Sequence, residues 1–250
     1  MKTVLITGCS SGFGLETAKY FLERGWKVIA TMRTPREDIL PRSENLRILA
    51  LDVSKTESIR KAIADAGPID ALVNNAGIGM LNPLEGSSID SIREIFETNT
   101  IGTIAMTQAV LPQFRERKSG VIVNVTSTVT VKALPLLAVY TASKAAINAF
   151  TESVAIELAP FNIRARLVLP GLAPQTNFGA NARTRMGTGP EAYSALVQQV
   201  MTGLTQASGP ITHSQDVAEQ IWKVVTDPSA PMRNPAGEDA VMWAKETKFI

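Results

Sequence analysis

Three polar side chains, Ser127, Tyr140 and Lys144, have types and spacings suited to proton transfer. Tyr140 and Lys144 lie four positions apart in a helical pattern, so they share one helix face. With three tyrosines in the chain, such a pair is by itself a weak signal. A free tyrosine has a pKa of about 10, and a neighbouring ammonium lowers that pKa by favouring the phenolate. Ser127 ends the apolar run "VIVNVTS" and could hydrogen-bond a substrate oxygen. The combination fits hydride transfer between a carbonyl and an alcohol, because a proton moves at oxygen while hydride moves at carbon.

A glycine-rich turn, "TGCSSGFG", separates the first apolar run from the first helical pattern. A turn in this place directs backbone N–H groups and the positive end of a helix toward a diphosphate. Gly8 would permit the tight turn, Gly12 a close backbone approach, and Gly14 close packing of helix on strand. An ordinary turn is the alternative, but the strand before it and the helix after it favour dinucleotide binding.

The segment "KVIATMRTP", at the end of the second apolar run, indicates which dinucleotide would bind. NAD sites usually place Asp or Glu about 20 residues after the glycines, whereas no acid precedes Glu37 here. Arg33 could hold a 2′-phosphate by charge-assisted hydrogen bonds. We therefore expect NADP(H), with NAD(H) as the weaker alternative. In the other interpretation Arg33 is only a solvated charge at a strand end.

Short apolar runs alternate with helical patterns along the first two thirds of the chain. The runs fit strands buried on both faces of a parallel sheet, and they are Thr3–Thr7, Lys27–Thr31, Leu46–Leu51, Ala71–Val73, Val121–Thr126 and Ile163–Leu169. The helical patterns are Gly14–Arg24, Lys55–Ala66, Ile89–Arg117 and Val139–Ala159. This alternation predicts an α/β protein, a single Rossmann-type domain with a doubly wound parallel sheet.

The composition changes after Pro170. Residues 171–212 contain six Gly and three Pro and no clear strand, with one helix expected over 190–204. A segment this long predicts a small helical substrate lobe, about 172–212, within one oxidoreductase domain covering 1–250. A further helix is expected from about 214 to 225, and the Pro-rich tail from Asp227 includes a helix in one interpretation.

The composition excludes several classes of protein. The chain of 250 residues is 45% hydrophobic and has a net charge of +2, which argues against intrinsic disorder and against a nucleic-acid partner. One cysteine cannot form an internal disulfide, and no Cys/His cluster predicts a metal site. No apolar stretch predicts a targeting or membrane segment, so we expect a soluble, cytoplasmic protein. Cys9 is expected to be a packed thiol and His213 a surface or capping residue.

The motifs together resemble the short-chain dehydrogenase/reductase family, in its compact branch with NADP-preferring carbonyl reductases. They are "TGCSSGFG", "LDV", "NNAG", "ETN", "VNVTS", "YTASK" and "LPG", in the family's order and spacing. The resemblance is strong over residues 1–171 and weak beyond them. The tail lacks the glycine-rich ending of tetrameric relatives, which leaves a homodimer, a homotetramer or a monomer open.

The resemblance implies roles for individual residues. Tyr140 would be the general acid in reduction and the base in oxidation, Lys144 would bind the nicotinamide ribose and lower the tyrosine pKa, and Ser127 would orient the carbonyl. Asn99 would hold a water that links Lys144 to solvent; the alternative is a helix-interior Asn bonded to its own backbone. The residues expected to contact the cofactor are Gly8, Ser10, Ser11, Gly12, Phe13, Gly14, Arg33, Asp52, Val53, Asn74, Ala76, Gly77, Tyr140, Lys144, Pro170, Gly171 and Thr176. Capping of the next helix is the alternative for Asp52, and an ordinary turn is the alternative for Asn74.

Apolar residues dominate the segments expected to line the substrate pocket. They are Ile78, Met80, Leu81, Leu134, Leu136, Leu137 and Val139, and in the lobe Phe178, Met186, Tyr193, Leu196, Val200 and Met201. Core packing is the competing explanation for about half of them, and Arg183 and Arg185 could meet an anionic group or be solvated. The sequence thus predicts an NADP(H)-dependent oxidoreductase for a small hydrophobic ketone or aldehyde and its alcohol. The alternatives are a β-ketoacyl-type reductase acting on a carrier-linked substrate and a non-catalytic NADP-binding sensor.

Overall fold

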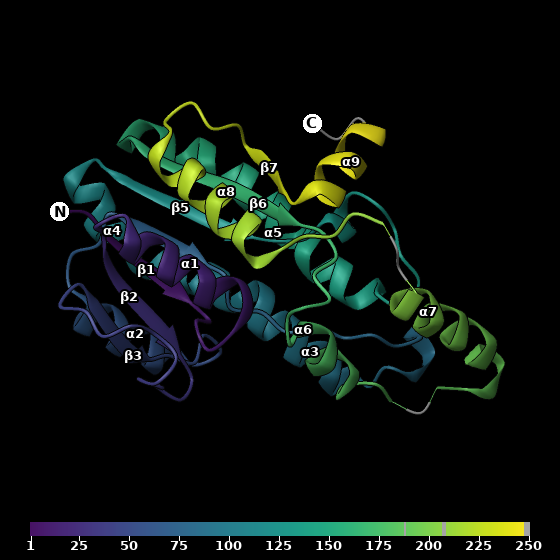
Figure 1. Ribbon diagram of the computed structural model, residues 1–250. Coiled ribbons are helices and arrows are strands. Elements are labelled where there is room, and N and C mark those ends of the chain that lie inside the picture. The colour runs from purple at the N-terminus through teal and green to yellow at the C-terminus, as the bar shows by residue number, and fades with distance from the viewer. Residues whose placement is uncertain (188, 207–208, 248–250) are drawn as a thin grey trace.

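The computed structural model describes residues 1–187, 189–206 and 209–247, and one parallel sheet organises them (Figure 1). Its strands are β1 (Thr3–Thr7), β2 (Lys27–Met32), β3 (Leu46–Ala50), β4 (Ala71–Asn74), β5 (Gly120–Val125), β6 (Ile163–Pro170) and β7 (Arg233–Ala236). The strand order is β3-β2-β1-β4-β5-β6-β7, so the direction of winding reverses between β1 and β4. Ligands of such sheets bind beyond the carboxyl ends of the strands at this reversal. The predicted Rossmann-type fold is confirmed.

Helices cover both faces of the sheet. The α-helices of the described residues are α1 (Gly12–Glu23), α2 (Thr56–Ala66), α3 (Ile89–Phe96), α4 (Gly102–Arg117), α5 (Ala138–Leu158), α6 (Phe178–Arg183), α7 (Ser194–Gln206), α8 (Ser214–Thr226) and α9 (Glu238–Glu246). Of these, α1 and α8 pack on one face of the sheet, and α2, α4 and α5 pack on the other. One core contains Phe21 of α1 and Ile221 of α8, and the other contains Ile59 of α2, Phe114 of α4 and Val154 of α5. The sheet therefore lies between two hydrophobic layers.

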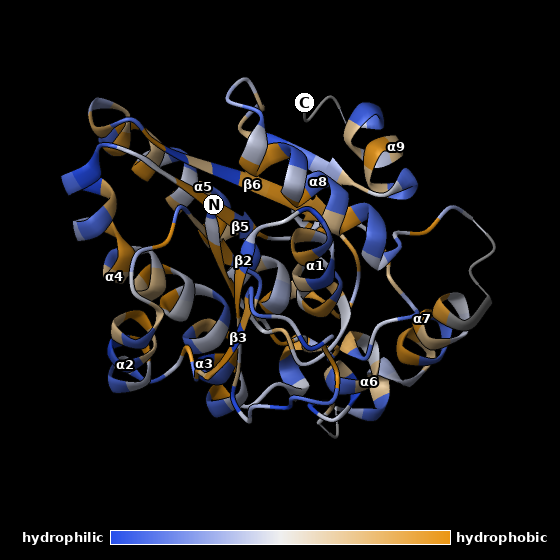
Figure 2. Ribbon diagram, turned by 60° about the vertical axis from the view of Figure 1, so that its left-hand side comes forward, coloured by the Kyte–Doolittle hydropathy of each residue, from blue (hydrophilic) through white to orange (hydrophobic). Residues whose placement is uncertain are grey.

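The strands are apolar because both of their faces are covered. In β1, Val4 and Ile6 pack into the core with α1 and α8, whereas Leu5 packs into the opposite core. Alternate side chains of a strand point to opposite faces, so every residue of such a run needs to be hydrophobic. The hydrophobic colours along the strands in Figure 2 follow from this arrangement.

The long helical pattern expected from Ile89 to Arg117 is helical but not uniform. A π-helical segment, Glu97–Ile101, joins α3 to α4. Its extra residue in the turn widens the helix, and such insertions are frequent at functional sites. Asn99 lies in the middle of this segment. The periodicity of hydrophobic residues predicts a helix there but does not reveal the inserted residue.

The C-terminal part contains two elements that the sequence did not predict. Helix α6 has only six residues, and strand β7 includes Pro235. Proline is tolerated in β7 because this strand is at the edge of the sheet. The helices expected near α7 and α8 are present, and His213 is the N-cap of α8, with its N–H donating to Asp216 Oδ2 at 2.8 Å.

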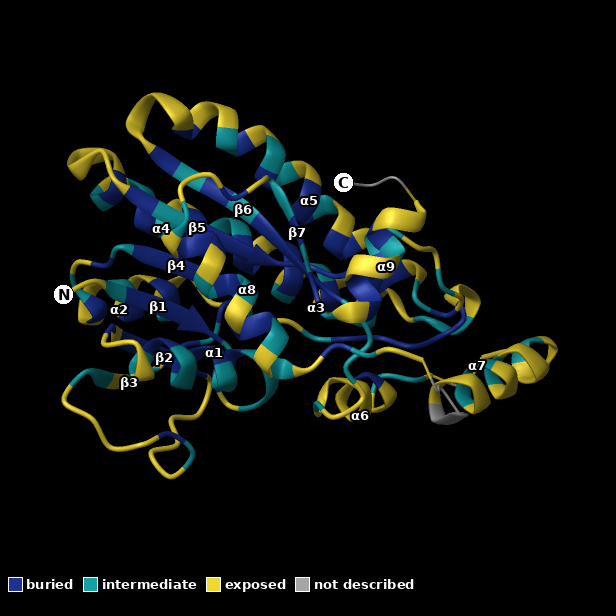
Figure 3. Cartoon of the chain, turned by 45° about the horizontal axis from the view of Figure 1, so that its top comes forward, coloured by how far each residue is buried: buried dark blue, intermediate teal, exposed yellow. Residues whose placement is uncertain are grey.

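Figures 1 and 3 show α7 at the periphery of the molecule, away from the sheet and largely exposed. Its partly buried residues Val197, Val200 and Met201 pack in one cluster with Leu81 and Leu136. Across the ranges described, none of the helices has the length and hydropathy to cross a membrane.

Candidate active site

Tyr140 and Ser127 meet beyond the carboxyl end of β5. Tyr140 lies in the first turn of α5, and Ser127 precedes the 3₁₀ turn Thr128–Thr130, whose first amides it caps through Val129 N–H at 3.3 Å. Both side chains are buried, with 6% and 8% exposure. Burial raises the pKa of Tyr140, and a hydrogen bond with Ser127 opposes that rise without cancelling it. The phenol is therefore protonated at neutral pH and able to donate.

Lys144 lies one helical turn after Tyr140. Its Nζ donates to Val125 O at 3.0 Å and lies 5.9 Å from the centroid of the Tyr140 ring. Burial lowers the pKa of this lysine to about 8, because the apolar surroundings disfavour the ammonium. The amine can thus gain or lose a proton close to neutral pH, next to the Tyr140 ring.

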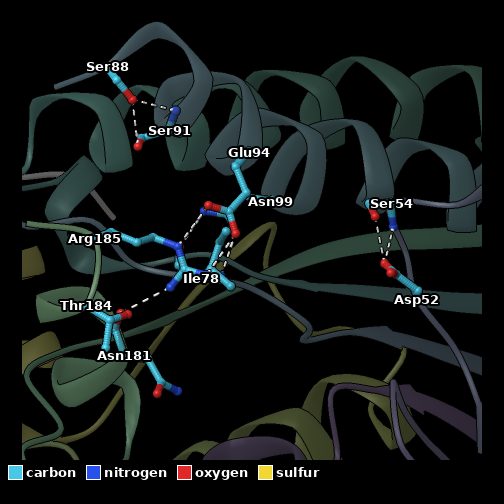
Figure 4. Close-up of polar contacts among 10 residues, drawn as sticks. All are labelled: Asp52, Ser54, Ile78, Ser88, Ser91, Glu94, Asn99, Asn181, Thr184 and Arg185. Carbon is cyan, nitrogen blue, oxygen red and sulfur yellow. Dashed lines mark hydrogen bonds and ion pairs between the residues drawn. The ribbon is translucent and has the colours of Figure 1, made fainter.

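Asn99 is held by groups from two other segments. Its Oδ1 accepts from Ile78 N–H and its Nδ2 donates to Ile78 O, both at 2.9 Å (Figure 4). Nδ2 also donates to Ser143 Oγ at 3.1 Å. A Cβ placed on Gly77 would lie 3.3 Å from both Asn99 Oδ1 and Lys144 Nζ. Asn99 and Lys144 therefore flank the same point of the backbone. Ile78 was expected in the substrate pocket, but its backbone bonds to Asn99 were not predicted, and neither was Ser143, whose hydroxyl has no distinguishing motif.

The glycine turn leads tightly from β1 into α1 and leaves the start of the helix open. Gly8 and Gly12 have φ of +76° and +57°, and a Cβ on Gly8 would lie 2.8 Å from Ala76 Cα. Helix α1 begins at Gly12, and the Ser11 side chain at its N-cap makes no capping hydrogen bond within the described chain. The first amides of α1 are thus available to an anion. Thr176 lies 3.6 Å from the position of a Cβ on Gly12, so the expected Thr176 does reach this turn.

Arg33 follows β2 at the same edge of the sheet and is exposed. Its charge contributes to lowering the pKa of two carboxyl groups, Asp52 and Glu94, so this cation and both acids act on the same region. Burial acts to raise the pKa of Asp52, but two hydrogen bonds from Ser54 and the charge of Arg33 outweigh it. Those bonds, at 3.0 and 2.7 Å, both end on Asp52 Oδ1 (Figure 4). Asp52 lies shortly before α2 but is not its N-cap residue, because Lys55 occupies the N-cap position of that helix.

Helix α6 lies over the tyrosine. The Phe178 ring packs at 5.3 Å from the Tyr140 ring, tilted by 56°. Beyond the helix, Arg185 binds Glu94 of α3 through two hydrogen bonds, Nε to Oε2 at 3.2 Å and Nη2 to Oε1 at 2.9 Å (Figure 4). The ion pair with Arg185 lowers the pKa of Glu94. No pattern in the sequence predicts this pair. It fastens the segment after α6 to the helix that leads to Asn99.

Some expected residues have structural surroundings. The Asn74 side chain donates to Thr107 Oγ1 at 3.2 Å and to Asn124 Oδ1 at 2.9 Å, so it is bonded inside the core. Burial raises the pKa of Cys9 to about 12, which agrees with a packed thiol. No group of residues suited to a metal ion occurs in the parts of the chain that are described. The other expected cofactor residues lie in the segments around this edge of the sheet: Ser10, Phe13, Gly14, Val53, Pro170 and Gly171.

Comparison with known proteins identifies the family. Residues 2–187 match the family model described as short chain dehydrogenase. Retinol dehydrogenase 8 from Bos taurus is 35% identical over 253 residues, covering 93% of this chain and 80% of the relative. The chain belongs to the short-chain dehydrogenase family. This dehydrogenase is also 33% identical to 3-ketodihydrosphingosine reductase from Bacteroides thetaiotaomicron, over 99% of its own length and 92% of the relative.

Solved structures agree with this assignment. The dehydrogenase superposes with a TM-score of 0.81 on a serine dehydrogenase complexed with NADP⁺, which is 29% identical, with 95% of each chain covered. It superposes with a TM-score of 0.77 on a 3-ketoacyl-(acyl-carrier-protein) reductase from Brucella melitensis complexed with NADH, 27% identical, covering 94% and 96% of the two chains. Relatives of this dehydrogenase therefore bind either nucleotide, and the chain is an oxidoreductase acting between CH–OH and C=O groups.

Proposed function

We propose that this dehydrogenase interconverts a hydrophobic ketone or aldehyde and its alcohol with NADP(H), using Tyr140 as the general acid and base. One observation carries the proposal. A buried tyrosine lies with the buried Ser127 beside it, which opposes the rise in its pKa, and with the buried amine of Lys144 5.9 Å from its ring centroid, beyond the carboxyl ends of the strands. A non-catalytic sensor would have no need of such proton-transfer groups.

The protein's own groups have distinct tasks in this proposal. In reduction the Tyr140 hydroxyl donates its proton to the carbonyl oxygen, and Ser127 donates a hydrogen bond that polarises and orients the same oxygen. Lys144 as an ammonium favours the phenolate that remains, which offsets the raised pKa that burial imposes on Tyr140. In this proposal Asn99, held by Ile78, binds the water that passes protons between Lys144 and solvent. When bound, the nicotinamide supplies or accepts the hydride.

The preference for NADP(H) rests on Arg33. This exposed guanidinium stands beyond β2 with Asp52 and Glu94 near it, and a 2′-phosphate would be held there by charge-assisted hydrogen bonds. NAD(H) would gain nothing from the guanidinium and would lack the carboxylate that usually holds its ribose at the end of β2. We therefore expect NAD(H) to be the weaker cofactor.

The proposal of an apolar substrate is based on the residues around α6 and α7. Leu81, Leu136 and Ala182 form a buried cluster with the partly buried Met186 and Val200, and the Phe178 ring covers Tyr140. A substrate that reaches Tyr140 therefore passes apolar surface. The names of two relatives, a retinol dehydrogenase and a 3-ketodihydrosphingosine reductase, agree with a hydrophobic substrate.

Replacing Tyr140 with Phe tests the catalytic assignment. We expect turnover of a ketone panel to fall by about 10²–10⁴-fold, because the acid is lost, with cofactor affinity changed less than about threefold. Absorbance of the reduced cofactor measures turnover, and its fluorescence measures binding. Tyr20→Phe, on α1, is the matched control and keeps full activity. Undiminished turnover of Tyr140→Phe would contradict the proposal, and activity confined to carrier-linked substrates would favour the β-ketoacyl alternative.

Replacing Arg33 with Ser tests the cofactor assignment. We expect the KM for NADPH to rise by about 10–100-fold and the KM for NADH to change by less than about threefold, because only the 2′-phosphate loses its partner. Arg36→Ser is the control, since Arg36 is an exposed arginine three positions later that pairs with Asp38 at 2.9 Å. Equal effects on both cofactors would assign Arg33 no role in selecting between them.

A further inference from the structure

A buried carboxylate outside the proton-transfer groups links the last helix to the strand ends. Asp239, in the first turn of α9, is 1% exposed. Its Oδ2 accepts from Leu172 N–H and its Oδ1 accepts from Thr212 Oγ1, both at 2.6 Å. Leu172 follows β6 and Thr212 precedes α8, so one side chain connects three segments that are distant in sequence.

Thr212 makes two further hydrogen bonds to the same backbone. Its Oγ1 accepts from Gly171 N–H at 2.9 Å, and its own N–H donates to Leu172 O at 2.8 Å. The Asp239 carboxylate also fills the space that a side chain at position 171 would need. The N–H groups of Gly171 and Leu172 and the carbonyl of Leu172 are thus fixed from the C-terminal side by Thr212 and Asp239, rather than by a neighbouring strand.

The same backbone is fixed from the other side by the segment that carries Ser127. Thr128 Oγ1 donates to Pro170 O at 3.1 Å, and Thr126 N–H donates to Val168 O at 2.8 Å. A continuous path of hydrogen bonds therefore runs from the serine turn through residues 170–172 to Thr212 and Asp239. A shift at the α9 end of this path would move backbone that adjoins the reacting groups.

We propose that Asp239 is a positioning residue that holds the Gly171–Leu172 backbone against the nicotinamide end of the cofactor site. The proposal rests on the proposed function, because it assumes that the cofactor lies along this edge. Asp239 acts through hydrogen-bond geometry and touches neither substrate nor cofactor. It fixes the distance between the residue 170–172 backbone and the Ser127–Tyr140 pair, on which the rate of hydride transfer depends.

Two disruptive variants and one conservative variant test this role. Asp239→Ala removes both acceptors, and Thr212→Val removes the hydroxyl that Gly171 N–H needs. Asp239→Asn can preserve the geometry, since its oxygen can accept from Leu172 N–H and its amide can donate to Thr212 Oγ1, which then donates to Ala236 O, 3.0 Å away. Glu238→Ala is the matched control, because it removes an exposed carboxylate from the same turn of α9.

Binding of two probes separates positioning from general damage. Adenosine 2′,5′-bisphosphate occupies only the adenosine end, whereas NADPH occupies the whole site. For Asp239→Ala and Thr212→Val we expect the Kd of NADPH to rise about tenfold, kcat to fall by about 10–100-fold and the Kd of the bisphosphate to stay within about twofold. Asp239→Asn and Glu238→Ala should remain within about threefold of the wild type in every measurement.

The effect on hydride transfer and on the free protein completes the test. With NADPH deuterated at the transferred position, the isotope effect on kcat should increase in Asp239→Ala, because the chemical step becomes slower than release. Hydrogen exchange of the Leu172 amide in the cofactor-free protein should accelerate at least about tenfold, because its acceptor is gone. Thr212→Val provides the same readouts if Asp239→Ala does not fold.

Distinct results overturn the two proposals. Wild-type protein that neither binds NADPH nor reduces any ketone would refute the proposed function. If the wild type is active, the positioning role would be refuted by a folded Asp239→Ala or Thr212→Val variant in which the ratio of the Kd of NADPH to the Kd of the bisphosphate is unchanged. Equal losses in Asp239→Asn and Asp239→Ala would also refute it, since geometry would not then be what Asp239 supplies.

Discussion

At the scale of single residues, Lys144 shows how function and stability compete. Its ammonium has one described hydrogen-bond partner, Val125 O, and is 5% exposed, so burial lowers its pKa from 10.5 to about 8. The unfolded chain keeps this proton up to about pH 10.5, whereas the folded protein releases it from about pH 8. The folded state is therefore penalised in full below pH 8, and the penalty disappears between about pH 8 and 10.5.

Replacing Lys144 with Met should abolish turnover and stabilise the cofactor-free protein. At pH 7 we expect the free energy of unfolding to rise on the order of 2 kcal/mol, the removed penalty less one lost hydrogen bond. The gain should shrink as the pH increases from about 8 to 10.5. Urea unfolding at several pH values measures it. A gain independent of pH, or a loss at pH 7, would show that Lys144 is not a destabilising buried cation.

At the scale of elements, the site depends on a π-helical segment within a long helix and on the short helix α6. The π-helical segment Glu97–Ile101 presents Asn99 to Ile78, and α6 brings Phe178 over Tyr140. The Arg185–Glu94 pair connects these two parts, since Glu94 precedes the π-helical segment and Arg185 follows α6. The pair is bidentate and Arg185 is the better shielded partner, with 18% side-chain exposure against 50% for Glu94, so its geometry distinguishes it from an ordinary surface ion pair.

Replacing Glu94 with Gln should loosen α6 over the site. We expect the KM for hydrophobic ketones to rise about three- to tenfold with kcat within about twofold, because the pair holds the covering segment and takes no part in proton transfer. Limited proteolysis within residues 176–187 should accelerate. Asp90→Gln is the control, since Asp90 also lies on α3 and pairs with the exposed Arg93 at 3.2 Å. Parallel effects in both variants would show that α3, rather than the tie to Arg185, is responsible.

At the scale of the whole molecule, stability and chemistry occupy opposite ends of the sheet. The glycine turn, Ser127 and residues 171–172 lie beyond the carboxyl ends of the strands, and Pro170 is the last residue of β6. Phe114, which is fully buried, packs against Gly120 at the start of β5, so it lies at the amino end. A change in packing there should alter the free energy of unfolding without moving the reacting groups.

Replacing Phe114 with Leu should test this separation. We expect a loss of about 1–2 kcal/mol in the free energy of unfolding, on the scale of other reductions of buried side chains. The kcat at 25 °C and the KM for cofactor should remain within about twofold of the wild type. Thermal unfolding and steady-state assays measure the two effects. A fall in kcat that corresponds to as many kcal/mol as the loss in the free energy of unfolding would show that the two ends are coupled.

Much of the fold and part of the site could be predicted from the sequence. Continuous apolar strands, the glycine turn and the Tyr140–Lys144 spacing are local patterns, and each follows from covered strand faces, tight backbone turns or helix periodicity. Strand β7 escaped prediction because its proline is tolerated only at a sheet edge, and its place at the edge is a property of the assembled sheet.

The tertiary structure alone decided which distant groups meet. The sequence by itself determined the fold class, the family and the residues able to move a proton, because these depend on residue type and short spacing. It could not show that Arg185 binds Glu94 or that Asp239 binds Leu172 and Thr212, at separations of 91, 67 and 27 residues. Such pairs have no periodicity, since their partners are brought together only when the sheet and its covering helices pack.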